Sequence, residues 1–479
     1  MNAQNRPSIS EVLEIDSVAI VGVSPRMGYY WVHTMTQWEH DLEIFFVSRS
    51  GGEVMGRPIY PSLTEVPSNV DYVIVAVPQR AVISVLKEAA AKGAKAATVF
   101  SSGYSELGTA EGRQNEEELR EVVNNIGLRI LGPNCMGLMY PQLGFAFVPT
   151  VPRVEGDVGF VSQSGGVAIA AYTAGTASGL GFSKLFSFGN AVDIKPPEIV
   201  NYFADDDETN VLGIYIEGAN DGRELVGHLR ETALEKPIVA LKGGRSTEGS
   251  RVAASHTGAL AGNLEIWKAA LRQANVVSVN TIEDLVGTLS VFSMCPEPES
   301  RNVGIVAISG GTSVIYTDLC IEAGLKVPET SPEIRERLNP LIQDVGTSLK
   351  NPIDLAADYY MDQTVSEVIR IVGDEENFDS IIIEADAHNI HQIASIMGAE
   401  DAIGYYWDSL AEGARSIVDR HNKPVLAAIP DIAYPEARNI AWEAIKARDL
   451  PIFHNMSECI GSLARVCDYY ETRRQRETK

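Results

Sequence analysis

The chain has 479 residues, 45% of them hydrophobic and 22% charged, and a formal net charge of −25 at pH 7. This composition is typical of a soluble globular enzyme of about three domains, and so acidic a chain lacks the broad basic face that nucleic-acid binding requires. No stretch reaches the roughly 20 consecutive apolar residues of a membrane helix, no signal pattern opens the sequence, and its five cysteines form no CxxC pair, so we expect a cytoplasmic protein with reduced thiols.

Residues 1–150 alternate short apolar strands with helical stretches. The predicted strands lie at 17–24, 44–48, 71–78, 97–103 and 128–134. This alternation predicts a parallel, doubly wound sheet of Rossmann-like type, in which ligands bind at the carboxyl ends of the strands. Small or polar residues stand at those ends: Gly22, Ser24, Ser48, Pro78, Ser101, Ser102, Gly103 and Asn134.

The turn after the first strand lacks the GxGxxG fingerprint of dinucleotide-binding enzymes. It is bounded by two glycines, Gly22 and Gly28, and includes Ser24, Pro25 and Arg26. Arg49 follows the second strand, where an NAD enzyme usually carries an acidic residue for the ribose. The segment therefore predicts a nucleotide-like ligand other than NAD, and an NAD-dependent oxidoreductase is the weaker alternative.

Residues 151–296 and 301–479 open in the same way. In each segment a strand breaks at a Ser-Gly-Gly triplet and turns directly into a helix, at Ser164-Gly165-Gly166 and at Ser309-Gly310-Gly311. The two openings predict two copies of one flavodoxin-like plan. We therefore expect an α/β chain of three domains, with boundaries at 1–150, 151–296 and 301–479.

Residues 241–263, LKGGRSTEGSRVAASHTGALAGN, are dense in small residues and hold one histidine, His256. A loop of this length inside a compact domain is usually functional, and small residues let the backbone approach a bulky anion. Neutral imidazole accepts a phosphoryl group well near pH 7, because its unperturbed pKa is about 6.5. The predicted loop therefore favours a phosphorylated histidine over a structural histidine in a glycine-rich turn.

A phosphohistidine needs groups that stabilise its negative charge. The helix that starts at Ser164, Gly165 and Gly166 offers backbone N–H donors and the positive end of its dipole, although the same triplet also suits a tight β–α turn. Glu217 ends the strand VLGIYIE at the same carboxyl edge. Its carboxylate could bind one ring nitrogen and present the other as nucleophile, and a solvated acid at a strand end is the alternative.

These motifs together resemble the NDP-forming acyl-CoA synthetases, relatives of succinyl-CoA synthetase. The motifs are SQSGG (162–166), SFGN (187–190), IEG (216–218), GRSTEG (244–249) and SHTGALAG (255–262), and GPNCMG (132–137) resembles the GPNC motif of the family's CoA-binding domain. The resemblance implies a Rossmann-like CoA-binding domain followed by two ligase domains, as in an α subunit. It also implies an ADP-forming ligase, which converts acyl-CoA, ADP and phosphate reversibly to a carboxylic acid, CoA and ATP through an acyl phosphate and a phosphohistidine.

By this resemblance, His256 is the phosphorylated residue, Glu217 orients it, and the helix from Gly165 and Gly166 stabilises the phosphate. The resemblance also implies that the strand-end loops hold CoA. Their residues are Gly22, Ser24, Pro25, Arg26, Gly28, Ser48, Arg49, Pro78, Ser101, Ser102, Gly103, Glu106, Asn134 and Cys135.

Two positions depart from the family's usual sequence. Bulky Tyr29, Tyr30 and Trp31 stand in the first loop, where small residues are common. FVSRSGGE replaces the usual Val-Asn-Pro after the second strand, and Arg49 there is a candidate contact to a phosphate or to adenine, since a guanidinium binds either.

The chain carries no GxxxxGK[ST] loop and no recognisable ATP-grasp stretch. We therefore expect ATP or ADP and Mg²⁺ to bind on an ATP-grasp β subunit, in a hetero-oligomer that acts on a small carboxylic acid or its acyl-CoA. Asp386, His388 and His391 are too few to predict a metal site on this chain. The alternatives on the same fold are a CoA-binding regulatory protein without catalysis and a citrate- or malate-activating relative.

Overall fold

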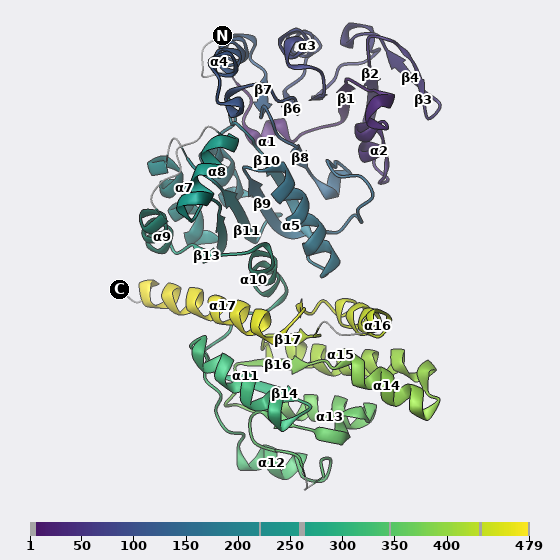
Figure 1. Cartoon of the computed structure of the whole chain (residues 1–479), viewed down its shortest axis with the longest axis vertical. Coiled ribbons are helices and arrows are strands. Elements are labelled where there is room, and N and C mark those ends of the chain that lie inside the picture. Colours follow the sequence, from purple (N-terminus) through teal and green to yellow (C-terminus); the bar gives the residue numbers. More distant parts are fainter. Residues whose placement is uncertain (1–5, 220–221, 258–263, 344–345, 431–433, 478–479) are drawn as a thin grey trace. The chain divides into compact units, whose positions relative to one another are not determined.

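A computed structural model of the chain describes residues 6–219, 222–257, 264–343, 346–430 and 434–477. These residues form three β-sheets that are packed against helices (Figure 1). By their contacts they divide into two compact units, Met1–Thr176 with Gly181–Ile282 and Ala177–Leu180 with Glu283–Lys479. The first unit contains the first two sheets and the second unit contains the third, and the boundaries of three separate domains stay a prediction.

The first sheet has seven strands in the order β3-β4-β2-β1-β5-β6-β7, and only β3 is antiparallel to its neighbour. The strands are β1 Ser17–Val21, β2 Glu43–Val47, β3 Gly52–Val54, β4 Arg57–Tyr60, β5 Tyr72–Val75, β6 Ala96–Val99 and β7 Arg129–Leu131. The helices are α1 Ile9–Val12, α2 Tyr30–Thr36, α3 Gln79–Ala91 and α4 Ala110–Ile126. Apart from β3, this is the 3-2-1-4-5-6 order of Rossmann sheets, whose ligand crevice opens between β1 and β5.

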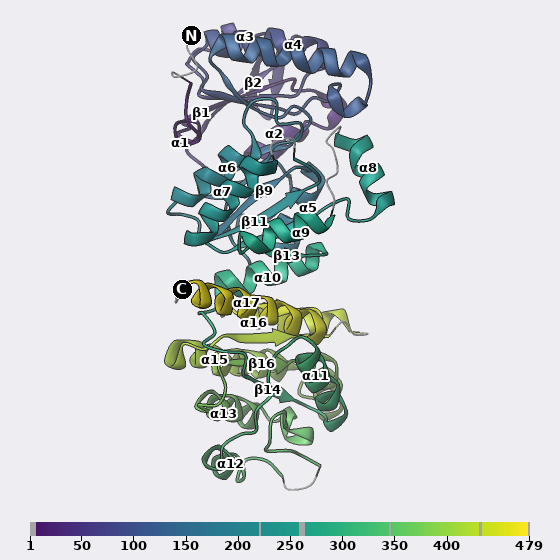
Figure 2. The same ribbon diagram turned by 90° about the vertical axis from the view of Figure 1, so that its left-hand side faces the viewer.

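Burial explains why these segments adopt their structures. Every residue of β1, β5 and β6 is buried, as parallel strands covered on both faces must be. In α3 the buried residues are Val82, Val85, Leu86 and Ala89, which recur at helical spacing and form the face toward the sheet. α3 and α4 lie side by side over this sheet (Figure 2).

The second sheet has the order β13-β12-β11-β9-β10-β8. The strands are β8 Gly137–Met139, β9 Glu155–Ser162, β10 Phe182–Ser187, β11 Val211–Ile216, β12 Ile238–Lys242 and β13 Val277–Val279. The helices are α5 Gly165–Ala177, α6 Pro196–Asp205, α7 Gly222–Glu235, α8 Thr247–Thr257 and α9 Leu264–Gln273. The five parallel strands follow the flavodoxin order, and β8 adds an antiparallel edge, so that GPNCMG connects the first sheet to the second.

The third sheet has the order β15-β14-β16-β17-β18, which is the flavodoxin order again. Its strands are β14 Val303–Ala307, β15 Ile353–Asp354, β16 Ser380–Glu384, β17 Val425–Ala428 and β18 Ile452–Phe453. The helices of this part are α10 Ile282–Met294, α11 Gly310–Glu322, α12 Pro332–Leu338, α13 Asp362–Gly373, α14 Ala387–Met397, α15 Ile403–His421, α16 Pro435–Lys446 and α17 Met456–Glu477. The predicted α/β class, with one Rossmann-like and two flavodoxin-like sheets, is confirmed.

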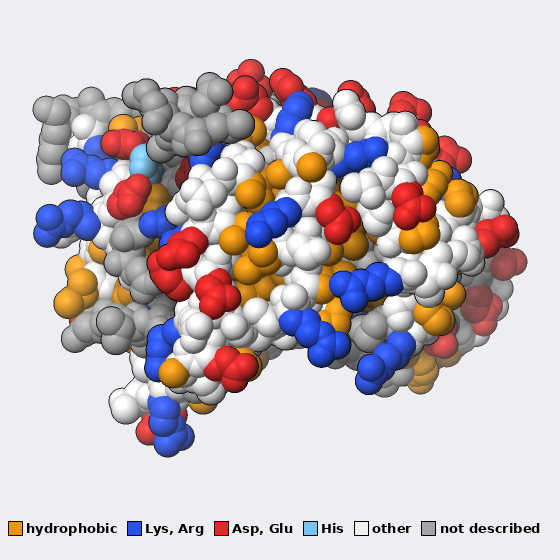
Figure 3. All heavy atoms as spheres, turned by 90° about the horizontal axis from the view of Figure 1, so that it is seen from above, with side chains coloured by type: hydrophobic (Ala, Val, Ile, Leu, Met, Phe, Trp, Pro, Cys, Tyr) orange, Lys and Arg blue, Asp and Glu red, His pale blue; other side chains and the backbone are white. Residues whose placement is uncertain are grey.

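Charges of both signs are mixed on one face of the molecule. Figure 3 shows Lys and Arg side chains interspersed with Asp and Glu on the face seen from above, with apolar patches between them. No helix in the described part of the chain has the length and apolar character to cross a membrane.

Candidate active site

Gly22 follows β1 at the crevice of the first sheet. Its φ is +108°, and a Cβ built on it would lie 2.1 Å from the carbonyl oxygen of Ala76. Only glycine fits there, since other residues rarely adopt this φ and the backbone leaves no room for a side chain. The loops after β1 and β5 therefore touch, and both border the same crevice.

The other residues of the β1 loop form one short 3-10 turn, Pro25–Met27. Ser24 caps it, because its Oγ accepts a hydrogen bond from the backbone N–H of Arg26 at 3.2 Å, and Gly28 closes it in the left-handed conformation. Ser48 and Arg49 follow β2, and Arg49 is exposed. The structure places all of these residues at strand ends, as expected, and their contacts with CoA stay a prediction.

A cavity of 580 Å³, here called the central cavity, joins two predicted groups of ligand-binding residues. The first sheet contributes Pro78, Ser101, Ser102, Asn134 and Cys135, and the second contributes Ser164, Gly165 and Gly166. Its size is that of ordinary small-molecule sites, which span about 300–1,000 Å³. A thioester held by the first group would therefore reach an anion held by the second within one space.

The helix α5 begins at Gly165, directly after β9. The Oγ of Ser164 accepts a hydrogen bond from the N–H of Val167 at 3.4 Å, and the N–H of Ala168 donates to the carbonyl of Ser164 at 3.1 Å. The amides of Gly165 and Gly166 precede these bonds, in the turn whose N–H groups have no helical partner. A helix start of this kind suits an anion, because its amides and its dipole both favour negative charge, and phosphate binding there stays a prediction.

Cys135 lines the central cavity, but its thiol is not a reactive group there. Its side chain is buried, and its Sγ lies 3.8 Å from the carbonyl oxygen of Val99. Burial raises the pKa of the Cys135 thiol well above its ordinary value, so the nucleophilic thiolate is strongly disfavoured.

Glu217 follows β11, next to the end of β9, and its side chain is 8% exposed. Gln163 holds its backbone, since the Oε1 of Gln163 accepts hydrogen bonds from the N–H groups of Glu217 at 2.7 Å and Gly218 at 3.2 Å. The hydroxyl of Tyr215 donates to the Glu217 carboxylate at 3.0 Å. Glu217 is therefore a buried, oriented carboxylate and not the solvated strand-end acid of the alternative reading.

Lys242 contacts the backbone of Glu217. Its ammonium donates to the backbone carbonyl of Glu217 at 2.5 Å and to the carbonyl of Gly243. Burial lowers the pKa of Lys242, and the Glu217 charge partly offsets that effect. Sequence reasoning missed Lys242 and Gln163, although Gln163 stands within the SQSGG motif.

His256 lies in the last turn of α8, and its side chain falls outside the described residues. The prediction of a continuous loop over 241–263 is wrong for 247–257, which are helical. Ala253 and Ala254 favour helix, and Ser246 stabilises its start by accepting a hydrogen bond from the N–H of Gly249 at 2.9 Å. Residues 258–263 lie outside the described part of the chain, and the pairing of His256 with Glu217 stays a prediction.

The helix α8 packs against the 3-10 turn η4, Ser105–Leu107. This turn belongs to the loop after β6, which holds Ser101, Ser102 and Gly103. The helix that carries His256, which is labelled α8 in Figure 2, therefore lies beside a loop predicted to bind CoA.

The Glu106 carboxylate forms hydrogen bonds within the protein, and Glu106 does not line the central cavity. Its carboxylate accepts hydrogen bonds from the N–H groups of Gly103 at 2.6 Å and Tyr104 at 3.0 Å, and from Nδ2 of Asn190 at 2.7 Å. Asn190 comes from the SFGN segment after β10. The bond therefore ties a predicted CoA loop to the second sheet.

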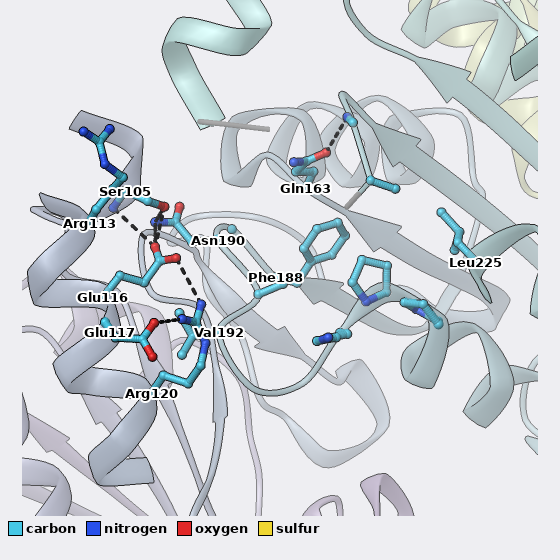
Figure 4. A pocket seen from close by; sticks show the side chains of 17 residues that line it. Ser105, Arg113, Glu116, Glu117, Arg120, Gln163, Phe188, Asn190, Val192 and Leu225 are labelled. Carbon is cyan, nitrogen blue, oxygen red and sulfur yellow. Dashed lines mark hydrogen bonds and ion pairs between the residues drawn. The ribbon is translucent and has the colours of Figure 1, made fainter. Parts of the chain in front are cut away.

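A further cavity, of 540 Å³, is lined in part by Asn190 (Figure 4). Glu116 accepts hydrogen bonds there from Asn190 at 2.9 Å and from Ser105, and Arg120 bridges Glu116 at 3.3 Å and Glu117. Both this cavity and the central one are lined by Gln163, Gly189 and Asn190. The two cavities therefore border each other at these three residues.

The second unit repeats the plan around Ser309 and Gly310. Glu384 ends β16 beside the start of α11, where it accepts hydrogen bonds from the N–H of Ile308 at 3.2 Å and the hydroxyl of Tyr316 at 2.5 Å. Burial raises the pKa of Glu384. The buried carboxylate at the strand end thus recurs with the Ser-Gly-Gly helix start.

The residues of EADAHNIH have structural partners. Asp386 caps α14 by accepting the N–H of Asn389 at 3.1 Å, and the ring of His388 stacks on Tyr434 with centroids 5.0 Å apart. His391 lies 5.4 Å from the same ring. Within the described ranges, no group of three or more His, Cys, Asp or Glu side chains is arranged to hold a metal ion.

Comparison with known proteins assigns both parts of the first unit to families. Residues 16–141 match a CoA binding domain, and residues 155–292 match a succinyl-CoA ligase like flavodoxin domain. Among curated proteins, the α subunit of ADP-forming acetate–CoA ligase I of Pyrococcus furiosus is 34% identical over 397 residues, which cover 81% of this chain and 82% of that protein. The α subunit of ligase II from the same organism is 34% identical over 353 residues, which cover 72% and 76%.

Solved structures agree in fold over the whole chain. PH0766 from Pyrococcus horikoshii is 25% identical with a TM-score of 0.80, and the match covers 97% of this chain and 99% of that one. The dinucleotide-forming acetyl-coenzyme A synthetase 1 of Candidatus Korarchaeum cryptofilum, solved with phosphate and ADP, is 24% identical with a TM-score of 0.83 and covers 98% of both chains. The fold of the two matched domains, with a third sheet after them, is therefore shared with these proteins.

Proposed function

This chain belongs to the family of ADP-forming acetate–CoA ligases, as an α subunit that interconverts acyl-CoA, ADP and phosphate with a carboxylic acid, CoA and ATP, and we propose that His256 carries the phosphoryl group between the two half-reactions. The observation that supports this proposal best is the central cavity. There the predicted CoA loops and the start of α5 line one space, so a thioester and a phosphate would meet.

In the first step, phosphate binds at the amides of Gly165 and Gly166. A phosphate oxygen attacks the thioester carbonyl of the acyl-CoA, the C–S bond breaks, and CoA leaves as a thiolate that takes up a proton. The helix start favours this step because its N–H groups and dipole stabilise the negative charge of the phosphate. The product is an acyl phosphate in the same cavity.

In the second step, one ring nitrogen of His256 attacks the phosphorus of the acyl phosphate. The P–O bond to the carboxylate breaks, and the free acid leaves. Glu217 accepts a hydrogen bond from the other ring nitrogen, which fixes the tautomer and stabilises the positive charge that develops on the ring. The buried, oriented carboxylate of Glu217 supports this role.

The phosphohistidine then transfers its phosphoryl group to ADP, which is bound on a separate chain. We propose an ATP-grasp β subunit, which would also hold Mg²⁺, because this sequence has no phosphate-binding loop of its own. The relatives named as α subunits support a partner of this kind. The five free cysteines fit work in a reducing compartment, and a cytoplasmic location belongs to the same proposal.

Incubation of the chain with its β subunit, Mg²⁺ and ATP labelled in the γ-phosphate tests this proposal. The chain should take up label that is lost in acid, and addition of CoA with a substrate acid should discharge it. A His256→Ala chain should stay unlabelled. Label that persists on His256→Ala would contradict the proposal.

Two other functions on this fold are less well supported. A CoA-binding regulatory protein without catalysis would not require a buried, oriented carboxylate at Glu217 beside the start of α5. Such a protein would also take up no labelled phosphate from ATP. A citrate- or malate-activating enzyme would use the same phosphohistidine, but the similar α subunits are named for acetate. An acid panel in the discharge assay separates these cases.

A further inference from the structure

A second cavity, of 350 Å³, lies beside the loop after β1, and its lining includes Gly22 and Ser24, two residues predicted to contact CoA. Its lining is apolar and largely aromatic and includes Tyr29, Trp31, Val32, Ala76, Phe100 and Met136. We call it the aromatic pocket. It contains the bulky residues that set this sequence apart from its family at the first loop.

The walls of the aromatic pocket are fixed. The rings of Trp31 and Phe100 meet edge to face, with centroids 5.5 Å apart and planes at 81°, and Trp31 is only 7% exposed. The hydroxyl of Tyr30 donates to the carbonyl of Phe147 at 2.9 Å and so anchors the start of α2. Contacts within the chain therefore hold the pocket walls in place, as in the largely pre-formed sites of small molecules.

The aromatic pocket adjoins the site of the proposed chemistry. It shares Ala76, Phe100 and Met136 with the central cavity. Met136 also abuts the start of α5, since a Cβ on Gly165 would lie 2.6 Å from its Cγ. A group held in the pocket next to Met136 therefore lies close to the proposed phosphate site.

The two cavities differ in the polarity of their lining residues, and so in the ligand groups that they can hold. The central cavity carries polar side chains on Gln79, Ser101, Ser102 and Asn134, which suit the two amides of the pantetheine arm of CoA. The aromatic pocket has few polar groups, and an amide buried there would lose its hydrogen bonds to water without replacement. An apolar group fits it better than the pantetheine arm.

We propose that the aromatic pocket receives the hydrocarbon part of the acyl group, and that Trp31 and Phe100 determine how large this part can be. The substrate class is then an apolar carboxylic acid larger than acetate, since one methyl group leaves most of 350 Å³ unfilled. This inference rests on the proposed function, because it places the reacting carbonyl beside α5.

Calorimetric titration of the purified chain with CoA, acetyl-CoA, butyryl-CoA and hexanoyl-CoA tests the inference without the partner subunit. Affinity should rise from acetyl-CoA to hexanoyl-CoA by about fourfold or less for each methylene group that enters the pocket. Thioester affinities that stay level or fall along the series would overturn the inference, even if the variants below fail to fold. A chain that binds neither CoA nor any thioester would contradict the proposed function itself.

Two variants identify the pocket. Trp31→Leu enlarges it, so the affinity ratio of hexanoyl-CoA to acetyl-CoA should change at least threefold, while free CoA binds as it does to the wild type. Trp38→Leu is the matched control, because Trp38 is an aromatic residue of the same part whose Nε1 donates to the carbonyl of Val151 at 3.0 Å. Equal losses for CoA and all thioesters in Trp31→Leu would assign the pocket to the pantetheine arm and overturn the inference.

Discussion

Asn190 donates a hydrogen bond of 2.7 Å to the carboxylate of Glu106, and this bond joins the second sheet to a loop of the first. The other oxygen of the same carboxylate holds the amides of Gly103 and Tyr104. The shape of a predicted CoA loop therefore depends on a residue of the ligase part. A substitution at Asn190 should therefore change the affinity for CoA even if Asn190 does not contact CoA.

Substitution of Asn190 tests this coupling. Asn190→Ala should weaken CoA binding about tenfold, since it removes a hydrogen bond to a charged group. Asn190→Asp should weaken it further, because a new carboxylate would face Glu106 and Glu116. Titration with CoA measures both, and Asn201→Ala, at an exposed asparagine of the same unit, is the control. Unchanged CoA affinity in Asn190→Asp would disprove the coupling.

The two glycines at the start of α5 should respond differently to alanine. In Gly165→Ala the new methyl group would lie 2.6 Å from Cγ of Met136, so the unfolding temperature and the rate of phosphorylation should both fall. In Gly166→Ala the nearest atom is 3.8 Å away, and alanine favours helix, so the unfolding temperature should stay or rise. Thermal unfolding of both variants decides the matter, and equal destabilisation would contradict the packing described for Met136.

Glu217 should matter for phosphoryl transfer and not for CoA binding. In Glu217→Gln the amide oxygen would keep the hydrogen bond from Tyr215, which leaves an NH₂ group where the histidine needs an acceptor. We expect phosphorylation to slow about 100-fold or more, as when the acceptor behind a catalytic histidine is lost. Tyr215→Phe keeps the carboxylate and should slow it far less. Rapid-quench measurement of labelled protein gives both rates, and a normal rate in Glu217→Gln would remove this residue from the mechanism.

Glu458 in α17 should make the second unit sensitive to pH. Burial, together with Glu283 and Asp284, raises the pKa of Glu458 to about 7 from an ordinary value of 4.5. A raised carboxyl pKa favours the folded state below pH 4.5, and this contribution is lost as the pH rises through 7. Glu458→Gln should therefore raise the unfolding temperature at pH 8 and have little effect at pH 5.

Differential scanning calorimetry at both pH values checks this expectation. Glu299→Gln, at an exposed glutamate, is the control and should change little at either pH. A Glu458→Gln effect of the same size at pH 5 and pH 8 would show that Glu458 does not titrate in this range.

Local pattern was enough to predict the central strands of the three sheets and the strand ends that carry Gly22, Ser164 and Glu217, whereas edge strands such as β3, β8 and β18 were missed. Buried parallel strands are runs of apolar residues that end in small or polar ones, and such runs are visible in one sequence. The prediction of a loop was wrong at α8, where the many Ser, Ala and Gly residues suggested irregular structure. Alanine also favours helix, and composition alone did not decide between the two.

Contacts between distant segments could not be predicted in this way. Asn190 and Glu106 are 84 residues apart in the sequence, and neither their spacing nor their residue types predict the hydrogen bond between them. The contact of Gly165 with Met136 likewise depends on β8 joining the second sheet, which the GPNCMG motif does not reveal. Both contacts arise from tertiary packing, which a single sequence does not encode in a readable local pattern.

Labelling from the acyl-CoA side tests the central claim most directly, because it needs only this chain. The purified chain is mixed with radioactive phosphate and a panel of acyl-CoA thioesters, and the protein is then separated and treated with acid or alkali. The account predicts label on the wild-type chain that acid removes and alkali does not, release of free CoA, and no label on His256→Ala. Label of the same stability on His256→Ala, or label that resists acid, would contradict the account.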